Sequence, residues 1–252
     1  LISSLVVFFL SIVKQVKIMN KIKHLLVVGG AGNLGRAIVN TFKPSWKVAS
    51  LDLKPNSDAH HNVLFGDQTK PLKERVPTIY TNLESFSKQY DSILCVAGGW
   101  TGGSISDIEI FDQIDHMHKI QVVPSILSGH LASKYLTTGG FLVLTGAATP
   151  FKQSAPFMLA YSVAKTAVHS IALNLADCPD LPEKSTVATI LPTTIDTPEN
   201  RKAMPDEDWS QWSSPEKIAE LLLKWSEGKS RPSNGSFAVL QTVNGEVVPN
   251  FV

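Results

Sequence analysis

The sequence predicts an α/β fold: a doubly wound parallel sheet with helices on both faces. From residue 23 onward, short apolar runs alternate with segments of helical length, the pattern of a parallel sheet that is covered on both sides. The apolar runs are continuous rather than alternating, as expected for strands buried on both faces. The first of these runs leads directly into a glycine-rich turn and then into a helix.

The first strand and the turn after it predict a dinucleotide-binding site. Residues 25–28 are the apolar run, residues 29–35 are the turn, and a helix is expected to about residue 43. The spacing of the glycines matches the Rossmann-type fingerprint, in the strand–turn–helix context that the fingerprint requires. Glycines there let the backbone approach a pyrophosphate, whose charge meets the helix N-terminus. The cofactor-binding residues expected in this turn are Gly29, Gly30, Gly32, Asn33, Leu34 and Gly35.

Acidic residues end the next two predicted strands. Asp52 closes the strand 47–52 and lies 17 residues after Gly35, near the spacing at which a carboxylate binds the adenosine ribose. Because a carboxylate repels a 2′-phosphate, Asp52 favours NADH over NADPH, and the nearby Lys54 weakens this argument without reversing it. Asp67 closes a short strand at 63–67, where it is equally well interpreted as a contact to adenine or as an ordinary cap residue.

A glycine-rich loop with one tryptophan follows the fourth predicted strand. A helix is expected at 79–90 and the strand at 92–97, after which the chain runs Gly-Gly-Trp-Thr-Gly-Gly. Ligands of open parallel sheets bind outside the carboxyl ends of the strands, where this loop must lie. We therefore expect Ala97, Gly98 and Gly99 to contact the cofactor. Trp100 offers a flat face for a ring-shaped substrate, although a lid or core position is the alternative.

The second half of the chain continues the alternation of helix and strand. Helices are expected at roughly 106–117, 118–136 and 214–226, and strands at 141–144, 187–191 and 236–241. The polar segment 199–212 contains Pro205 and three consecutive acids, which predicts a mobile surface loop or lid.

A tyrosine and a lysine lie four residues apart in the helix that follows strand 141–144. This spacing places the Tyr161 phenol and the Lys165 ammonium on one helix face, one turn apart. A nearby positive charge favours phenolate, so Lys165 is expected to lower the pKa of Tyr161 toward neutrality. Such a phenol can exchange a proton with a substrate. A solvated helix face would show the same pair, but the preceding dinucleotide-binding elements favour a catalytic role.

Composition argues against several classes of function. The 252 residues suit one large α/β domain, and a net charge of +1 gives no indication of a nucleic-acid partner. Cys95 and Cys178 lie in apolar contexts, which predicts reduced packing residues of a cytoplasmic protein. A metal site is not expected, because His116 and His118 point in different directions on a helix and no cysteine or carboxylate cluster accompanies them.

The first 18 residues are expected to lie outside the domain. Residues 1–13 form an apolar run that is too short to span a bilayer and lacks a basic segment before it. Met19 stands just before the first strand. We interpret Met19 as the natural start, residues 1–18 as upstream or artificial sequence, and 19–252 as a single NAD-binding domain; a membrane anchor is the less favoured alternative.

Together, the glycine-rich turn, Asp52, the Ala97-Gly98 strand end and Tyr161-x-x-x-Lys165 resemble the short-chain dehydrogenase/reductase family over about residues 22–245. The resemblance implies a sheet of about seven parallel strands with three helices on each face. It also implies hydride transfer from a bound nicotinamide, with Lys165 on the nicotinamide ribose. Pro192 and Thr197, at the end of the sixth strand, are then expected to touch the cofactor.

This chain departs from the family pattern in the turn before the catalytic helix. Most members place a serine there to hold the substrate carbonyl, whereas this turn is Gly-Ala-Ala at 146–148, and Ser154 is misplaced for that role. Gln121 stands near the position of the family's helix asparagine.

Three segments resemble one branch of the family, which reduces quinonoid dihydropterin to tetrahydropterin with NADH. They are 95–100, 196–198 and 200–205, and the alanine in place of the serine fits the same branch. The resemblance implies substrate contacts from Trp100, Ala147 and Tyr161, with Tyr161 supplying the proton. It also implies a homodimer through helices around 118–136 and 156–177. Small residues in the second helix suit close helix contact, and an intramolecular contact explains them equally well; they are Ala160, Ala164 and Ala167. The alternatives are a carbonyl or steroid-type reductase and a non-catalytic NADH sensor.

Overall fold

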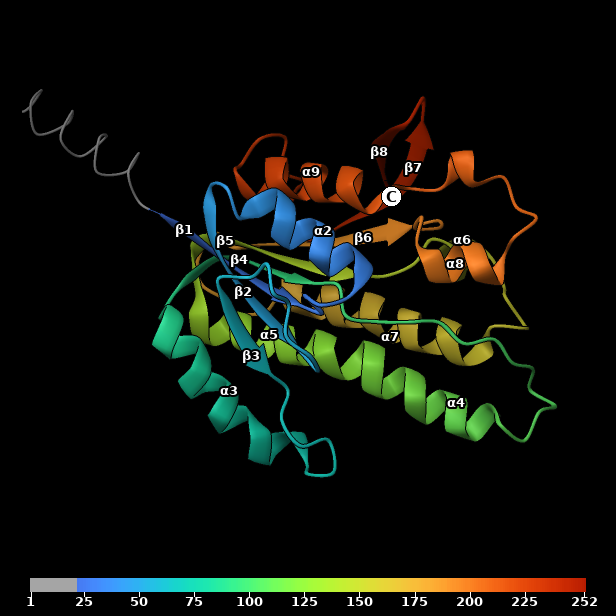
Figure 1. Cartoon of the computed structure of the whole chain (residues 1–252), viewed down its shortest axis with the longest axis horizontal. Helices are drawn as coiled ribbons and strands as arrows, with labels where there is room; N and C mark the ends of the chain where they lie inside the picture. Colours follow the sequence, from blue (N-terminus) through green and yellow to red (C-terminus); the bar gives the residue numbers. More distant parts are fainter. Residues whose placement is uncertain (1–21) are drawn as a thin grey trace, which may run out of the picture.

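The computed structural model describes residues 22–252, except the side chains of Pro150 and Lys152, so the predicted 1–18 extension lies outside the described residues. Eight strands of this part of the chain form one sheet in the order β3-β2-β1-β4-β5-β6-β7-β8 (Figure 1). The strands are β1 Lys23–Val28, β2 Trp46–Asp52, β3 His61–Leu64, β4 Tyr90–Cys95, β5 Leu136–Thr145, β6 Thr186–Pro192, β7 Ser236–Val243 and β8 Glu246–Phe251. The first seven are parallel, which confirms the predicted sheet.

The eighth strand was not expected from the sequence. β8 pairs antiparallel with β7 through the two-residue turn Asn244-Gly245, where both residues have positive φ angles of 51° and 77°. Asn-Gly between two apolar runs is the strongest short-range signal for a hairpin, because its backbone twist matches that of the strands. The signal for β8 was therefore present in the sequence.

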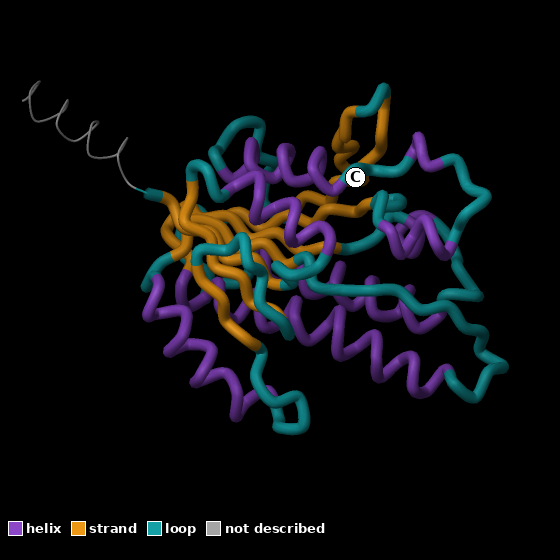
Figure 2. Tube along the Cα trace, viewed as in Figure 1, coloured by secondary structure: helices purple, strands orange, loops and turns teal. Residues whose placement is uncertain are grey.

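Helices cover both faces of the sheet. α2 (Asn33–Phe42) and α9 (Pro215–Ser226) pack together on one face. On the other face lie α3 (Leu72–Phe86), α4 (Ile110–Met117), α5 (Val123–Tyr135) and α7 (Leu159–Ala176) (Figures 1 and 2). The expectation of three helices on each face is wrong for the first face. Residues 53–60, which join β2 to β3 and contain Pro55 and Asn56, are too short and too rich in turn-forming residues for a crossover helix.

Three predicted helices have different boundaries. α3 begins seven residues before the expected residue 79, because Pro77 lies inside the helix instead of preceding it, and Tyr90 already belongs to β4. The helices expected at 106–117 and 118–136 are one continuous rod from 110 to 135, in which His118–Val122 forms a π-helical turn. Such turns frequently occur at functional sites.

The short elements lie toward the end of the molecule where the strands finish. α6 (Thr149–Lys152) follows β5, and α8 (Pro198–Ala203) and the 3₁₀ turn Trp209–Gln211 follow β6. The segment predicted as a loop or lid is therefore partly helical. Among the described residues, no helix is both long and apolar enough to cross a membrane.

Arg231 ties the end of α9 to the sheet. Its guanidinium donates to the carbonyls of Trp225 (2.9 Å) and Ser226 (3.1 Å) at the end of α9, and to Gly139 in β5 (2.9 Å). It also lies 4.9 Å from the centre of the Phe141 ring. Carbonyls at a helix C-terminus lack intrahelical donors, so the planar fork supplies a donor to the Ser226 carbonyl and a second one to the Trp225 carbonyl, which also accepts the Gly228 N–H at 2.9 Å.

We predict that Arg231→Met lowers the free energy of unfolding by about 1–3 kcal/mol, because the Gly139 and Ser226 carbonyls lose the guanidinium donor and the Trp225 carbonyl keeps only the Gly228 N–H. Arg231→Lys should recover only part of this loss, since an ammonium cannot reproduce the fork. Chemical denaturation monitored by circular dichroism measures both effects. Lys229→Met is the control, because the Lys229–Glu227 ion pair is exposed and should contribute less than about 1 kcal/mol. Equal effects at positions 229 and 231 would contradict this account.

Candidate active site

The glycines of the turn after β1 have different packing roles. A Cβ on Gly30 would lie 2.9 Å from Ser50 Cβ, and one on Gly35 would lie 2.7 Å from Gly30 Cα, so both positions exclude side chains. A Cβ on Gly32 would meet nothing closer than 3.5 Å, which leaves open space beside the backbone. Gly32 precedes the first residue of α2, and no side chain caps this helix. Its N-terminal N–H groups can therefore meet a ligand phosphate.

A buried asparagine that the sequence analysis left in a polar loop supports this turn. The Asn56 side chain is fully buried and donates from Nδ2 to the Gly30 carbonyl at 2.7 Å. The Asn62 side chain in turn accepts from the Asn56 backbone N–H at 2.8 Å. Nothing in the local sequence distinguishes Asn56 from a solvated loop residue, because its partner is 26 residues away.

Asp52 lies at the end of β2, beside the same turn. Its carboxylate accepts the N–H of Ala31 at 2.8 Å and that of Leu53 at 2.6 Å. Each carboxylate oxygen has a further lone pair, so this half-buried group can still accept a hydrogen bond from a ribose hydroxyl. The structure thus places Asp52 against the glycine-rich turn, as the predicted ribose contact requires.

Asp67 is exposed and acts as a cap in its own turn. Its Oδ1 accepts the Thr69 hydroxyl at 2.7 Å and the Thr69 N–H at 3.0 Å, and these bonds lower the pKa of Asp67. The geometry therefore shows the cap role that the sequence analysis left open. The contact between Asp67 and adenine stays a prediction.

The loop after β4 packs on the π-helical turn. The Ala97 N–H donates to Val28 of β1 at 3.0 Å, so this loop lies next to the glycine-rich turn. Gln121, buried in the π-helical turn, donates from Nε2 to the Gly99 carbonyl at 2.5 Å, and a Cβ on Gly98 would collide with its amide. The π-helical turn thus directs Gln121 to a loop in which Gly98 leaves room for the buried amide.

Trp100 is neither a core residue nor free to rotate. Its side chain is 57% exposed, and its Nε1 donates to Met158 Sδ at 3.1 Å. The Gly103 N–H also donates to the Phe157 carbonyl at 2.9 Å, which joins the loop to the segment before α7. The indole therefore presents an exposed flat face and is anchored to Met158, three residues before Tyr161.

Tyr161 and Lys165 lie on α7, as predicted, with the lysine buried. Lys165 is only 4% exposed, and its Nζ donates to the Thr145 carbonyl at 2.8 Å. The same Nζ lies 5.7 Å from the centre of the half-buried Tyr161 ring. The hydroxyl of Thr145 bonds the Cys95 carbonyl, so the ends of β4 and β5 meet beneath the ammonium.

The expected direction of the tyrosine pKa is wrong. Burial raises the pKa of Tyr161 to about 12, whereas proximity to Lys165 was expected to lower it. Burial also lowers the pKa of Lys165 to about 8, an effect that the Cys95 thiol partly opposes. Desolvation disfavours the charged form of each group. At neutral pH the phenol therefore keeps its proton, which is the form that can donate to a substrate.

The turn after β5 contains no hydroxyl at 146–148 and no free backbone donor. Each of its three N–H groups already has an acceptor: Gly146 donates to the Ile190 carbonyl (2.9 Å), Ala148 to the Pro192 carbonyl (3.2 Å) and Ala147 to His169 Nε2 (3.2 Å). Ser154 is exposed. The sequence analysis did not identify His169.

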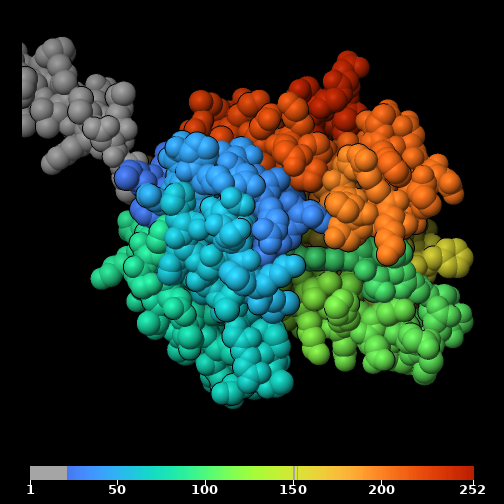
Figure 3. Space-filling model, in the orientation of Figure 1, coloured from blue at the N-terminus to red at the C-terminus, as the bar shows by residue number. Residues whose placement is uncertain are grey.

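The segment after β6 reaches back to the cofactor turn. Thr197 caps α8 by accepting the Asn200 N–H at 3.2 Å. Asn33 donates from Nδ2 to Glu199 of α8 at 2.6 Å, and the two surfaces, blue and orange in Figure 3, lie side by side. The structure therefore brings Asn33 and Thr197 to the same region, with Pro192 buried behind them.

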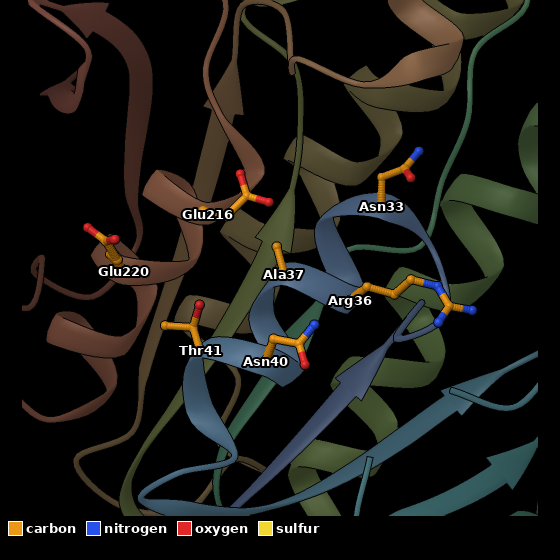
Figure 4. Close-up of a pocket in the computed structure, with 7 residues that line it drawn as sticks. All are labelled: Asn33, Arg36, Ala37, Asn40, Thr41, Glu216 and Glu220. Atoms are coloured by element: carbon orange, nitrogen blue, oxygen red, sulfur yellow. The ribbon is translucent and has the colours of Figure 1, made fainter. Parts of the chain in front are cut away.

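A hollow lies between α2 and α9 (Figure 4). It encloses about 400 Å³ and is lined by Asn33, Arg36, Ala37, Asn40, Thr41, Glu216 and Glu220. Neither Tyr161 nor Lys165 lines it, but Asn33 of the cofactor turn does, so the hollow adjoins the predicted cofactor site and does not include the catalytic pair. No cluster of three or more potential metal ligands occurs among the described residues.

Comparisons with known proteins agree with this geometry, although no protein-family model matches the chain. Dihydropteridine reductase from Dictyostelium discoideum is 37% identical over 223 residues, which are 87% of this chain and 95% of the relative. A short-chain dehydrogenase family protein from Francisella tularensis superposes with a TM-score of 0.73 at 22% identity, covering 87% of this chain and 97% of that one. BdcA in complex with NADPH gives a TM-score of 0.70 at 22% identity, covering 86% and 92%.

The two solved structures share the fold of this chain. The alignment with the Dictyostelium relative covers most of this chain and nearly all of that protein. This chain therefore belongs to the dihydropteridine reductase family of short-chain dehydrogenases/reductases and is an NAD(P)H-dependent oxidoreductase.

Proposed function

We propose that this enzyme reduces quinonoid dihydropterin to tetrahydropterin with NADH. The observation that supports this substrate most directly is the lack of free backbone donors in the turn 146–148, which follows the Thr145 carbonyl that Lys165 bonds. An isolated ketone oxygen needs a donor in addition to the proton-donating tyrosine, and this turn supplies none. A flat conjugated ring can instead be oriented by stacking on Trp100. The name of the Dictyostelium relative agrees with this substrate class.

The residues of the candidate site fit a nicotinamide dinucleotide. The open backbone beside Gly32 and the uncapped start of α2 would hold its pyrophosphate, Asp52 its adenosine ribose and Lys165 its nicotinamide ribose. The bound nicotinamide supplies the hydride. Tyr161 donates its phenolic proton to the reduced ring, and the Lys165 ammonium stabilises the phenolate that remains until solvent restores the proton.

The first test measures NADH oxidation while quinonoid dihydropterin is generated continuously in the cuvette. Fast pterin-dependent oxidation, absent with a panel of simple ketones, is the expected result. Turnover of ketones without pterin would favour a carbonyl or steroid-type reductase. Binding of NADH with no turnover would favour a sensor.

We predict that Tyr161→Phe lowers kcat by about 10²–10⁴-fold, because a positioned proton donor typically contributes that much. NADH affinity, measured by fluorescence titration, should change little. Tyr80→Phe removes a phenol from α3, far along the chain from the candidate site, and should leave kcat unchanged. Undiminished turnover by Tyr161→Phe would exclude Tyr161 as the proton donor.

Asp52 is proposed to set the preference for NADH. Replacing it with Asn removes the charge that would repel a 2′-phosphate, so the ratio of kcat/KM for NADH over NADPH should fall on the order of tenfold or more. Asp58 lies in the loop after β2, where its carboxylate pairs with Lys43. Asp58→Asn should therefore leave the ratio unchanged. An unaltered ratio in Asp52→Asn would show that other residues select the cofactor.

We also propose that the enzyme is a cytoplasmic homodimer that pairs through α5 and α7. Both cysteines are free thiols, which suits a reducing compartment. Ile126 of α5 and Val163 and Leu173 of α7 are each about half exposed, which leaves apolar side chains uncovered on both helices. Ala160 and Ala164, by contrast, are buried against α4 and the π-helical turn, so their small size serves an intramolecular contact.

If the dimer forms in this way, Val163→Lys with Leu173→Lys should convert it to a monomer, because two charges would be buried at the interface. Sedimentation velocity measures the change. Val243→Lys alters an equally exposed apolar residue of β7 and should leave the dimer intact. A doubly substituted protein that still sediments as a dimer would exclude this face.

A further inference from the structure

His169 continues the catalytic face of α7 by one more turn. Tyr161, Lys165 and His169 follow each other at intervals of four residues, and the His169 ring is only 7% exposed. Phe151 and Phe237 each lie edge-on to the ring with centroids 5.6 Å away. Apolar contacts therefore hold the imidazole in one position, next to the Ala147 N–H.

The turn after β5 rests directly on this ring. His169 Nε2 accepts the Ala147 N–H at 3.2 Å, and a Cβ on Gly146 would lie 2.6 Å from His169 Cδ2. Two residues earlier, the Thr145 carbonyl accepts Lys165 Nζ at 2.8 Å. Two side chains from consecutive turns of α7 thus hold this short loop. Lys165 donates to the Thr145 carbonyl, and His169 accepts the Ala147 N–H.

The protonation state of His169 suits this task. Burial, and then the charge of Lys165, lower the pKa of His169 to about 4, so the imidazole is neutral over the working range. The bond to Ala147 requires a lone pair on Nε2, which assigns the proton to Nδ1. A neutral acceptor at this position leaves the Ala147 N–H unavailable to any substrate.

We propose that His169 is a positioning residue for the reductase reaction. By holding the Ala147 N–H, it keeps the Thr145 carbonyl aimed at the Lys165 ammonium and thereby fixes the group that stabilises the Tyr161 phenolate. The catalytic part rests on the proposed function, because it uses the roles assigned to Tyr161 and Lys165. The structural part rests on the hydrogen bonds alone.

The test compares His169→Phe, which keeps a ring but has no acceptor, with His169→Gln, whose Oε1 can replace Nε2. In the Phe variant, Lys165 loses a fixed carbonyl, so the pKa of Lys165 should fall further and the alkaline limb of kcat/KM should move to lower pH. We also expect kcat to fall by about 10–100-fold, since small displacements of positioning groups cost this much. The Gln variant should restore both quantities toward wild type.

The alkaline limb near pH 8 is assigned to Lys165 because its neighbours titrate elsewhere. Burial raises the pKa of Tyr161 on α7 and of Cys95 on β4, and His169 titrates at about 4. Ser170→Ala changes the exposed residue next to His169 and should leave the pH profile unchanged. A profile that stays in place in His169→Phe, with only thermal stability reduced, would overturn the positioning role.

Two further measurements do not depend on activity. Hydrogen exchange at the Ala147 amide should be slow in the wild type and the Gln variant and faster in the Phe variant. Nitrogen-15 spectra of the wild-type imidazole should show a protonated Nδ1 and a bare Nε2, and a protonated Nε2 would overturn the proposal even if His169→Phe does not fold. A wild type that turns over no pterin would contradict the proposed function, while these measurements would still decide whether His169 holds the turn.

Discussion

The buried ammonium of Lys165 is the constraint on which the site depends. A charge removed from water is costly unless hydrogen bonds compensate it, and the Thr145 carbonyl is the acceptor that the structure provides. That carbonyl lies at the end of β5, so α7 must pack against the sheet in one register for the bond to form. Burial still lowers the pKa of Lys165 to about 8, so this one acceptor compensates the lost hydration of the ammonium only in part.

The remaining parts of the site use backbone groups that the parallel sheet brings to one edge. Strands β1, β4 and β5 are adjacent in the sheet, and the loops that follow them form this edge. The strand order reverses between β1 and β4, so these loops lie on both sides of that point. Cofactors of such sheets bind at this point because the loops diverge there. Glycine is required where the turn after β1 touches the loop after β4, because a Cβ on Gly29 would collide with the Ala97 nitrogen.

The sequence predicted those features that depend on local pattern. Continuous apolar runs identify the parallel strands, and the glycine spacing and the Tyr161–Lys165 interval identify the two halves of the site. β8 also had a local signal in Asn244-Gly245 that the sequence analysis did not use. Asn56 and His169 could not be identified in this way, because their partners are distant in sequence and the contacts exist only once the sheet is assembled. Gln121 was noticed only through the family resemblance, and its bond to Gly99 also needs the folded chain. The direction of the Tyr161 pKa depends on burial, which spacing alone does not reveal.

The arrangement of donors suggests how this site selects its substrate. In the turn 146–148 every N–H is already bonded, and the indole of Trp100 is joined to Met158, just before α7 and three residues before Tyr161. A ligand in such a site is oriented by its flat surface and receives a hydrogen bond mainly from the phenol. Polar groups on a substrate that needed further donors would be left unpaired, at a cost of about 1–3 kcal/mol each. On the proposed function, the turn without free donors therefore disfavours ketones, whereas a planar ring is held by its stacked face and by the proton it accepts from the phenol.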